Sequence, residues 1–321
     1  MLVIDGSHGE GGGQVLRTSL SLSAITGRPL RVINIRAGRS RPGLLPQHLT
    51  GVRALARVCH AQVEGDRLGS QELTFLPTTA PQAGSYTFDV AQVAKGGSAG
   101  SVGLVAQTVL LPLALASGTS QVILRGGTHV PWSPAYDYLQ RVYLPTLRRM
   151  GVEAKVQIVK WGWYPAGGGE VKATIQGLSP QARLEGLAMR QRGELLRVRG
   201  LSASSNLPKH VRERQAGTAL QVLRSNGINP RLETVDAPAK GTGSAVFLWA
   251  EFVNAMAGFG ALGEKGKPAE RVADEACRAL LAYLQGEGAL DRHLADQMIL
   301  PLAMAAGPSS FTAETVTQHL L

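Results

Sequence analysis

The N-terminal segment combines one carboxylate with several glycines at the junction of a predicted strand and a predicted helix. Residues 5–17 read DGSHGEGGGQVLR, and an apolar helical pattern follows up to residue 26. Glycine lets the backbone approach a phosphate closely, and a helix N-terminus attracts the anion. Glu10 is the only acid among the glycines, so it is the candidate ligand of a divalent metal beside that phosphate. A purely structural turn would seldom need so many glycines.

A second segment concentrates arginines between a predicted strand end and a predicted helix start. Residues 35–49 read IRAGRSRPGLLPQHL and contain Arg36, Arg39 and Arg41. Guanidinium groups at one loop repel each other unless phosphates neutralise them, and each can hold a phosphate through two hydrogen bonds. Solvated loop arginines are the alternative, and the upstream glycine loop favours phosphate binding.

The formal net charge of +10 favours a polyanionic partner such as nucleic acid, although a solvated basic surface would give the same value. The chain lacks both common nucleotide-binding signatures. Gln14 stands where a dinucleotide fingerprint needs glycine, and Ala261 stands where a P-loop needs it. No apolar run is long enough to span a membrane, and Cys59 and Cys277 are too few for a disulfide framework. These features predict a soluble, cytoplasmic protein with two reduced core cysteines.

Three further loops are less specific when each is taken alone. Residues 95–101, KGGSAGS, precede a predicted helix that contains Gln107, and residues 126–134 read GGTHVPWSP. Either could be an ordinary helix cap or turn. Residues 164–170, YPAGGGE, favour a tight hairpin over a ligand site.

The segment RHLADQ at residues 292–297 opens a predicted helix whose next turns are wholly apolar. Asp296 and Gln297 would be costly on such a helix unless they face a polar site near its start. His293 could equally be a neighbour of the helix cap with no further role.

These motifs belong to a pattern that occurs three times: a glycine-rich or small-residue start, an apolar helix, a small-residue stop and a strand. The copies have helices near residues 15–26, 102–116 and 294–306, with strands near 30–35, 120–126 and 309–317. The first two copies continue into a second helix, whereas the third reaches only Gln318-His319-Leu320-Leu321. That phrase matches Gln47-His48-Leu49 of the first copy, so we expect the natural chain to continue beyond residue 321.

The segment between the second and third copies has a different texture, with alternating strand and helix patterns. It predicts a compact α/β insertion. We therefore expect a large domain from residues 1–182, an inserted small α/β domain at 183–284, and the third repeat of the large domain at 285–321.

Taken together and in this order, the motifs DGSHGEGGGQVLR, IRAGRSRPGLLPQHL, GSAGS, GGTHVP, YPAGGGE, NLPKHVRER, HLADQ and QHLL resemble the RNA 3'-terminal phosphate cyclase family. The resemblance covers nearly the whole chain. It implies an α/β fold, with a large domain of three repeated βαβαββ units and a smaller α/β domain inserted before the third unit.

The resemblance also implies a three-step reaction that uses ATP and Mg²⁺ or Mn²⁺. A histidine takes AMP from ATP with release of pyrophosphate, AMP passes to an RNA 3'-phosphate, and the 2'-hydroxyl closes a 2',3'-cyclic phosphate as AMP leaves. The family's nucleophile matches His319, and its metal ligand matches Glu10. Its nucleotide-binding positions match Gln14, Gln107, Pro134, His293, Asp296 and Gln297, although relatives often carry tyrosine where His293 stands. Its RNA phosphate-binding positions match Arg17, Arg36, Arg39, Gln47 and His48.

Three other classes of function remain as alternatives. A non-catalytic cyclase-like RNA-binding protein in ribosome assembly would lack the nucleophilic histidine, so His319 and Glu10 argue against it. An enzyme of the enolpyruvyl-transferase kind would bind small anionic sugars without adenylylation. A plain RNA-binding module would fit the charge but would not explain Glu10 within the glycine loop.

Overall fold

The computed structural model describes residues 1–9, 11–93, 98–179 and 181–320 and shows a mixed α/β protein. Its first sheet has the strand order β1-β2-β4-β3, with β1 parallel to β2 and the other neighbours antiparallel. The strands and their connecting helices are β1 (Leu2–Asp5), α1 (Gly13–Thr26), β2 (Leu30–Ile33), α2 (Pro46–Val58), β3 (Gln62–Glu64) and β4 (Leu73–Leu76).

A second sheet repeats this strand order and these directions as β5-β6-β8-β7. Its elements are β5 (Ser85–Asp89), the 3₁₀ turn η1 (Val90–Val93), α3 (Val102–Ala114), β6 (Thr119–Gly126), α4 (Tyr136–Tyr138), the π-helical turn η2 (Leu139–Tyr143), α5 (Leu144–Arg148), β7 (Glu153–Lys160) and β8 (Gly169–Gln176). The antiparallel pair β7 and β8 is joined by residues 161–168, so YPAGGGE lies in a hairpin as predicted, although this connection is longer than a tight turn.

A third sheet, β11-β10-β12-β13, carries two helices on one face. Its elements are β10 (Leu195–Ser205), α6 (Lys209–Ser225), β11 (Arg231–Asp236), β12 (Gly243–Phe252), β13 (Met256–Leu262) and α7 (Ala269–Gln285). Along β12, Val246, Leu248 and Ala250 belong to the core beneath α6 and α7, while Phe247 and Trp249 join the core of the first two sheets. This alternation follows from the two-residue period of a strand and buries both faces of the sheet.

The C-terminal segment contributes α8 (Arg292–Ala303) and a short strand β14 (Ser310–Phe311), which pairs in parallel with β9 (Ala188–Met189). The predicted strand at 309–317 is therefore much shorter than expected. The remaining residues instead form bridges and turns, including a turn at residues 318–320 where a helix start was predicted.

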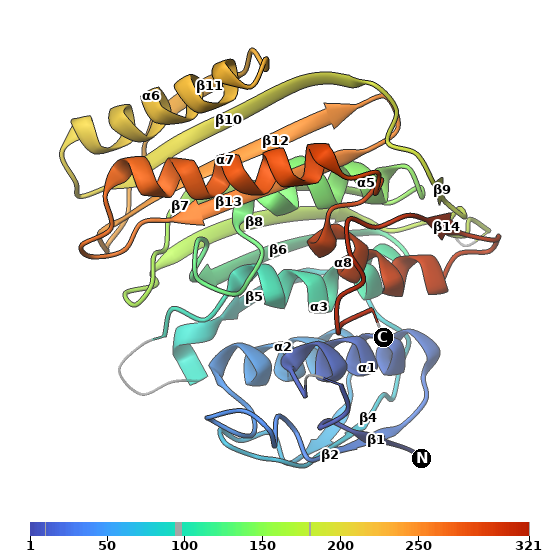
Figure 1. The fold of residues 1–321 in the computed structure, drawn as a ribbon. Helices are drawn as coiled ribbons and strands as arrows, with labels where there is room; N and C mark the ends of the chain where they lie inside the picture. The colour runs from blue at the N-terminus through green and yellow to red at the C-terminus, as the bar shows by residue number, and fades with distance from the viewer. Residues whose placement is uncertain (10, 94–97, 180, 321) are drawn as a thin grey trace.

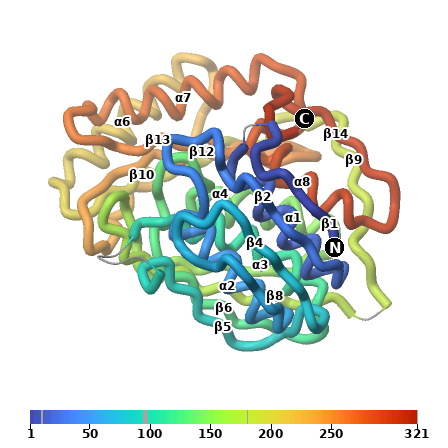
Figure 2. The backbone as a smooth tube through the Cα atoms, turned by 90° about the horizontal axis from the view of Figure 1, so that it is seen from below, coloured from blue at the N-terminus to red at the C-terminus, as the bar shows by residue number. Residues whose placement is uncertain are grey.

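The helices α1, α2 and α3 form a layer between the first two sheets, and α3 contacts both of the others (Figure 1). The helix α3 is buried along nearly its whole length, which explains its almost uniformly apolar sequence. Figure 2, a view from below, shows α8 beside α1 and the C-terminal segment near the start of the chain. Segments from both ends of the sequence thus meet beside the central helix layer.

Local sequence signals define the ends of the helices around this meeting point. Gly27, with φ of 67°, ends α1 in the left-handed conformation that glycine adopts easily. The Ser101 hydroxyl accepts a hydrogen bond from the Leu104 N–H and caps α3, and the Asp291 carboxylate caps α8. Cys59 and Cys277 are buried and unbridged, as predicted. Within the described residues, no helix combines the length and apolarity needed to cross a membrane.

Candidate active site

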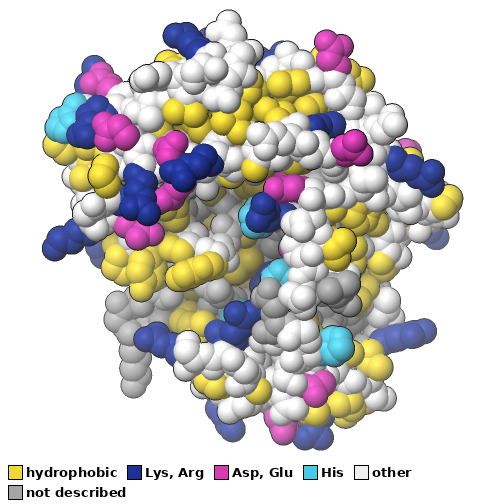
Figure 3. Space-filling model, viewed as in Figure 1, with side chains coloured by type: hydrophobic (Ala, Val, Ile, Leu, Met, Phe, Trp, Pro, Cys, Tyr) yellow, Lys and Arg dark blue, Asp and Glu magenta, His cyan; other side chains and the backbone are white. Residues whose placement is uncertain are grey.

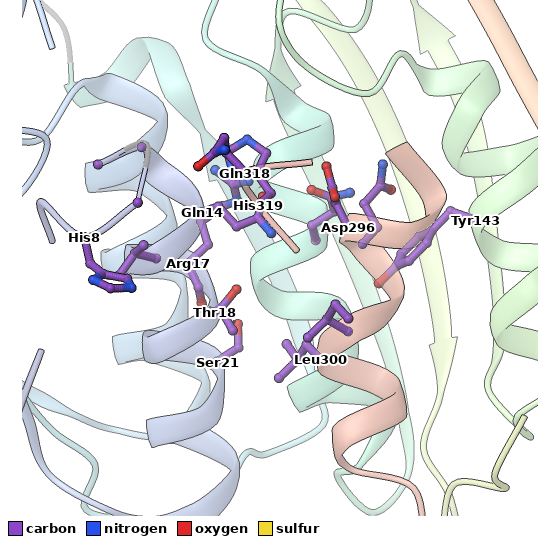
Figure 4. A pocket seen from close by; sticks show the side chains of 17 residues that line it. His8, Gln14, Arg17, Thr18, Ser21, Tyr143, Asp296, Leu300, Gln318 and His319 are labelled. Carbon is purple, nitrogen blue, oxygen red and sulfur yellow. Dashed lines mark hydrogen bonds between the residues drawn. The ribbon is translucent and has the colours of Figure 1, made fainter. Parts of the chain in front are cut away.

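A cavity of about 250 Å³ lies between α1 and α8, with α3 behind it and residues 318–319 beside its opening (Figure 4). Its walls include backbone of the N-terminal glycine loop at Gly9, Gly11 and Gly12. Six residues that the sequence assigned to a site line this cavity: Gln14, Arg17, Gln107, Asp296, Gln297 and His319. On the face seen in Figure 3, Lys, Arg and His side chains border a hollow in the middle of the molecule.

His319 lies at the N-terminus of α1, not within a helix of its own. Its imidazole Cε1 is 3.8 Å from the position that a Cβ atom on Gly12 would take, and a guanidinium nitrogen of Arg39 is 3.3 Å from the same position. Gly12 is the residue that precedes α1. The positive end of the α1 dipole favours a phosphate, so this position places the His319 imidazole next to a site suited to a bound phosphate.

Two hydrogen bonds link the His319 backbone to α8. The His319 N–H donates to Thr317 Oγ1 at 3.2 Å, and the Thr317 hydroxyl donates to Asp296 Oδ1 at 2.5 Å. The exposed imidazole is therefore carried on a segment that is fastened to the opposite wall of the cavity.

Arg17 and His48 meet at the first residue of α1. A Cβ atom on Gly13 would lie 2.3 Å from His48 Nε2 and 3.2 Å from an Arg17 guanidinium nitrogen, which is why glycine is needed there. Burial lowers the pKa of Arg17 to about 10, so the guanidinium is still charged at neutral pH. Within the described part of the chain no carboxylate pairs with it. A half-buried guanidinium without a carboxylate partner among the described residues, beside a helix N-terminus, is suited to an anionic ligand.

The pKa of His48 is lowered to about 3 by burial first and by the charges of Arg17 and Arg36 second. His48 is therefore neutral at physiological pH. Its Nδ1 accepts a hydrogen bond from the Leu45 N–H at 3.2 Å, so the ring proton resides on Nε2, which faces Gly13. This nitrogen can donate a hydrogen bond to a phosphate oxygen.

The other residues assigned to RNA phosphate lie beside this pair and have contacts of their own. The Arg36 guanidinium donates to the carbonyls of Arg41 and Gly43, at 2.5 and 3.0 Å, and so supports its own loop. Gln47 Oε1 accepts from the Ser101 N–H at 3.2 Å and joins the starts of α2 and α3. In the loop at residues 95–101, residues 95–97 lie outside the described part of the chain.

Two glutamines that line the cavity each carry a buried side-chain atom without a hydrogen-bond partner among the described residues. Gln107 Nε2, a donor, and Gln297 Oε1, an acceptor, are both buried and have no hydrogen-bond partner among the described residues. A buried polar atom without a partner costs about 1–3 kcal/mol, so such atoms at a cavity wall indicate a ligand that completes them.

Pro134 and His293 are not among the residues that line the cavity. The carbonyl and ring of Pro134 pack against Gly103 in the first turn of α3. His293 is exposed one turn before Gln297, with its ring edge-on to Tyr138 at a centroid distance of 6.4 Å. Glu10 lies outside the described residues, and within the described part of the chain no group of three or more His, Cys, Asp or Glu side chains could hold a metal.

Sequence reasoning missed Tyr143, which lines the cavity from the π-helical turn η2 (Figure 4). Burial raises the pKa of Tyr143, so its hydroxyl remains protonated. Proline lacks the N–H that an α-helix requires, and Pro145 is the second residue after this turn. A proline inside a predicted helix was the available signal, because π-helical turns are frequent at functional sites.

Known proteins resemble this chain over nearly its whole length. A family model described as RNA 3'-terminal phosphate cyclase matches residues 8–321. Curated proteins with that name are 51% identical in Nostoc punctiforme, over 100% of this chain and 91% of the relative, and 52% identical in Methylococcus capsulatus, over 100% and 88%. A protein of the same name from Archaeoglobus fulgidus is 43% identical over 99% of this chain and 92% of its own length.

Proposed function

The chain belongs to the RNA 3'-terminal phosphate cyclase family and is an ATP-dependent enzyme of that kind, and we propose that it works through a covalent histidine–AMP intermediate. In the first step a nitrogen of His319 attacks the α-phosphorus of ATP and pyrophosphate leaves. In the second, an RNA 3'-phosphate oxygen attacks the same phosphorus and frees His319. In the third, the neighbouring 2'-hydroxyl attacks the 3'-phosphorus, which closes the 2',3'-cyclic phosphate as AMP leaves.

The observation that carries this proposal is the position of His319 against Gly12 at the N-terminus of α1. An imidazole nitrogen is a good nucleophile toward phosphorus, and the same helix N-terminus attracts the phosphate that it would attack. Arg39, beside the same glycine, is positioned to stabilise the charge that develops on the phosphate oxygens.

The nucleotide is proposed to occupy the cavity beside α8. Its lining includes Gln14, Asp296, Gln107 and Gln297, whose side chains can hydrogen-bond the nucleoside. Pro134 and His293 are proposed to act from the rim, since neither lines the cavity.

The RNA 3'-phosphate is proposed to bind where Arg17, Arg39 and His48 converge on Gly12 and Gly13. Arg17 and Arg39 supply positive charge, and neutral His48 supplies a hydrogen-bond donor. Arg36 is proposed to hold its own loop in place, and Gln47 to hold the start of α2, through the hydrogen bonds described above. Both residues lie beside the proposed binding site of the RNA phosphate.

A divalent metal, Mg²⁺ or Mn²⁺, is proposed to bind Glu10. The support is the place of Glu10 in the sequence between Gly9 and Gly11, both of which line the cavity. When bound, the metal would neutralise phosphate charge and polarise the α-phosphorus for attack.

We also propose the three-unit arrangement of the large domain. The matching strand orders β1-β2-β4-β3 and β5-β6-β8-β7 support two of the units. The pairing of β9 with β14 supports a third unit that starts before the inserted domain, which would place the start of that domain after Met189 and not at residue 183.

Incubation with ATP labelled at the α-phosphate, followed by a denaturing gel, tests the function. We expect a protein–AMP adduct that is acid-labile and alkali-stable, absent from His319→Ala and retained in part by His293→Ala. An adduct that persists in His319→Ala, or one mapped to a lysine, contradicts the mechanism. RNA binding without any adduct in the wild-type protein would favour the non-catalytic alternative.

A further inference from the structure

Two aromatic side chains are exposed on adjacent loops outside the cavity. Trp132 is 98% exposed and Tyr164 is 67% exposed, and no other aromatic side chain in the described part of the chain is exposed among the large hydrophobic residues. The remaining tryptophans, Trp161, Trp163 and Trp249, are at most 6% exposed. Burying an aromatic side chain stabilises a protein strongly, so two that face solvent on neighbouring loops require a reason.

The loop that presents Trp132 is closed by hydrogen bonds and has a strained backbone at the tryptophan. Trp132 has φ of 56°, a conformation that is costly for a bulky residue and persists only where the surroundings impose it. The loop is closed by a hydrogen bond from the Tyr136 N–H to the Thr128 carbonyl at 3.0 Å, and by one from the Ser133 hydroxyl to the Val130 carbonyl at 3.1 Å. The backbone therefore holds the indole outward.

A buried network ties this loop to the one that carries Tyr164. The His129 ring bonds to Thr128 Oγ1 at 2.9 Å and to Asp137 Oδ2 at 2.8 Å, and it stacks on Trp161 at 4.2 Å. The Thr128 N–H donates to the Gly162 carbonyl at 2.8 Å. The loops that carry Trp132 and Tyr164 are therefore joined at their base by one buried network of hydrogen bonds and stacked rings.

This buried network adjoins the candidate active site. Two residues after Trp132, Pro134 packs against Gly103 in the first turn of α3, and Gln107 lines the cavity one turn later. Two residues of chain span up to about 7 Å, and four helical residues rise about 6 Å. The Pro134–Gly103 contact joins these two segments. The distance from the Trp132 indole to the cavity is therefore one that a few nucleotides of RNA can span.

We propose that Trp132, together with Tyr164 on the neighbouring loop, is a stacking platform for bases of single-stranded RNA upstream of the 3'-terminal phosphate. This proposal rests on the proposed function, because it needs an RNA end in the cavity. Aromatic rings stack on any base, so the platform holds RNA of varied sequence while the basic site holds the phosphate. Each loop exposes a single aromatic ring, and the network beneath the loops is polar and buried. This arrangement favours stacking of bases, whereas docking of a protein would favour a broad apolar surface.

The kinetic test compares a 3'-phosphorylated RNA of twelve nucleotides with a 3'-phosphorylated dinucleotide. For Trp132→Ala we expect KM for the longer RNA to rise about 5- to 100-fold, the loss of one stacked base, while KM for the dinucleotide stays at the wild-type value. Tyr164→Ala should raise KM for the longer RNA by a smaller factor, and Trp132→Phe should retain most of the affinity for that RNA. Leu196→Ala, at a 60% exposed position on β10, is the matched control and should behave as wild type.

A binding test needs no catalysis. Because the other tryptophans are buried, iodide should quench mainly Trp132, and single-stranded RNA should protect it, with the accessible signal lost in Trp132→Phe. Unchanged iodide quenching in the presence of saturating RNA, or an equal KM for the longer RNA in Trp132→Ala, overturns the platform and leaves the surface to another partner. Failure of wild-type adenylylation would instead overturn the proposed function.

Discussion

The hydroxyl of Thr317 donates a hydrogen bond to the carboxylate of Asp296 at 2.5 Å and so fastens the segment that carries His319 to the first turns of α8. The same oxygen accepts the His319 N–H. The proposed nucleophile and a wall of the proposed nucleotide site are therefore positioned by one side chain.

Replacing Thr317 by valine keeps the shape of the side chain and removes both hydrogen bonds. A hydrogen bond to a charged group contributes about 1.5–3 kcal/mol, so the rate of adenylylation should fall roughly 10- to 100-fold. Thr317→Ser keeps the hydroxyl and should retain most of the rate. Single-turnover formation of the AMP adduct measures the difference, and equal rates in the valine and serine variants would show that the link does not position His319.

The buried His48 predicts a particular dependence of stability on pH. Its pKa is about 3 in the folded protein and about 6.5 when unfolded, so the unfolded state binds more protons between these values. Stability should consequently fall as pH drops below 6.5, and this residue alone should account for roughly 2 kcal/mol at pH 5. His48→Gln removes the titrating group, so its loss of urea resistance between pH 7 and pH 5 should be smaller than that of wild type. Parallel losses in the two proteins would contradict a depressed pKa.

Arg39 should matter more for RNA than for folding. It is exposed, and removing an exposed arginine typically changes stability by less than roughly 0.5 kcal/mol. Arg39→Ala should weaken cyclisation far more than it lowers the melting temperature. Arg28→Ala, an exposed arginine just beyond the opposite end of α1, is the control and should cyclise normally. RNA affinity should also fall as the salt concentration rises, because binding releases counterions. An affinity that does not change with salt concentration would count against the basic site.

Glu10 is the proposed metal ligand, and its role can be tested by removing either partner. Glu10→Ala should abolish adenylylation while the circular dichroism spectrum and melting curve stay close to those of wild type. EDTA should abolish wild-type adenylylation, with recovery on addition of excess Mg²⁺ or Mn²⁺. Normal adduct formation by Glu10→Ala in magnesium would show that the metal, if required, is held elsewhere.

The amino-acid sequence by itself determined the α/β class, most helix positions and the motifs that could bind phosphate. These properties depend on local patterns: the apolar period along α1 and α3, the glycine that ends α1, and the polar pair Asp296 and Gln297 before the apolar turns of α8. Periodicity and turn residues act over a few positions, so a sequence displays them directly.

Only the tertiary structure decided which of these motifs meet and how their surroundings shift the pKa of their side chains. His319 faces the N-terminus of α1, some three hundred residues earlier in the sequence, because the packing of α1, α3 and α8 brings the two ends together. The same packing buries His48 beside Arg17 and lowers its pKa, while the Arg36 side chain instead supports its own loop. Contacts, desolvation and charge depend on three-dimensional distances, which residue types and sequence spacing do not specify.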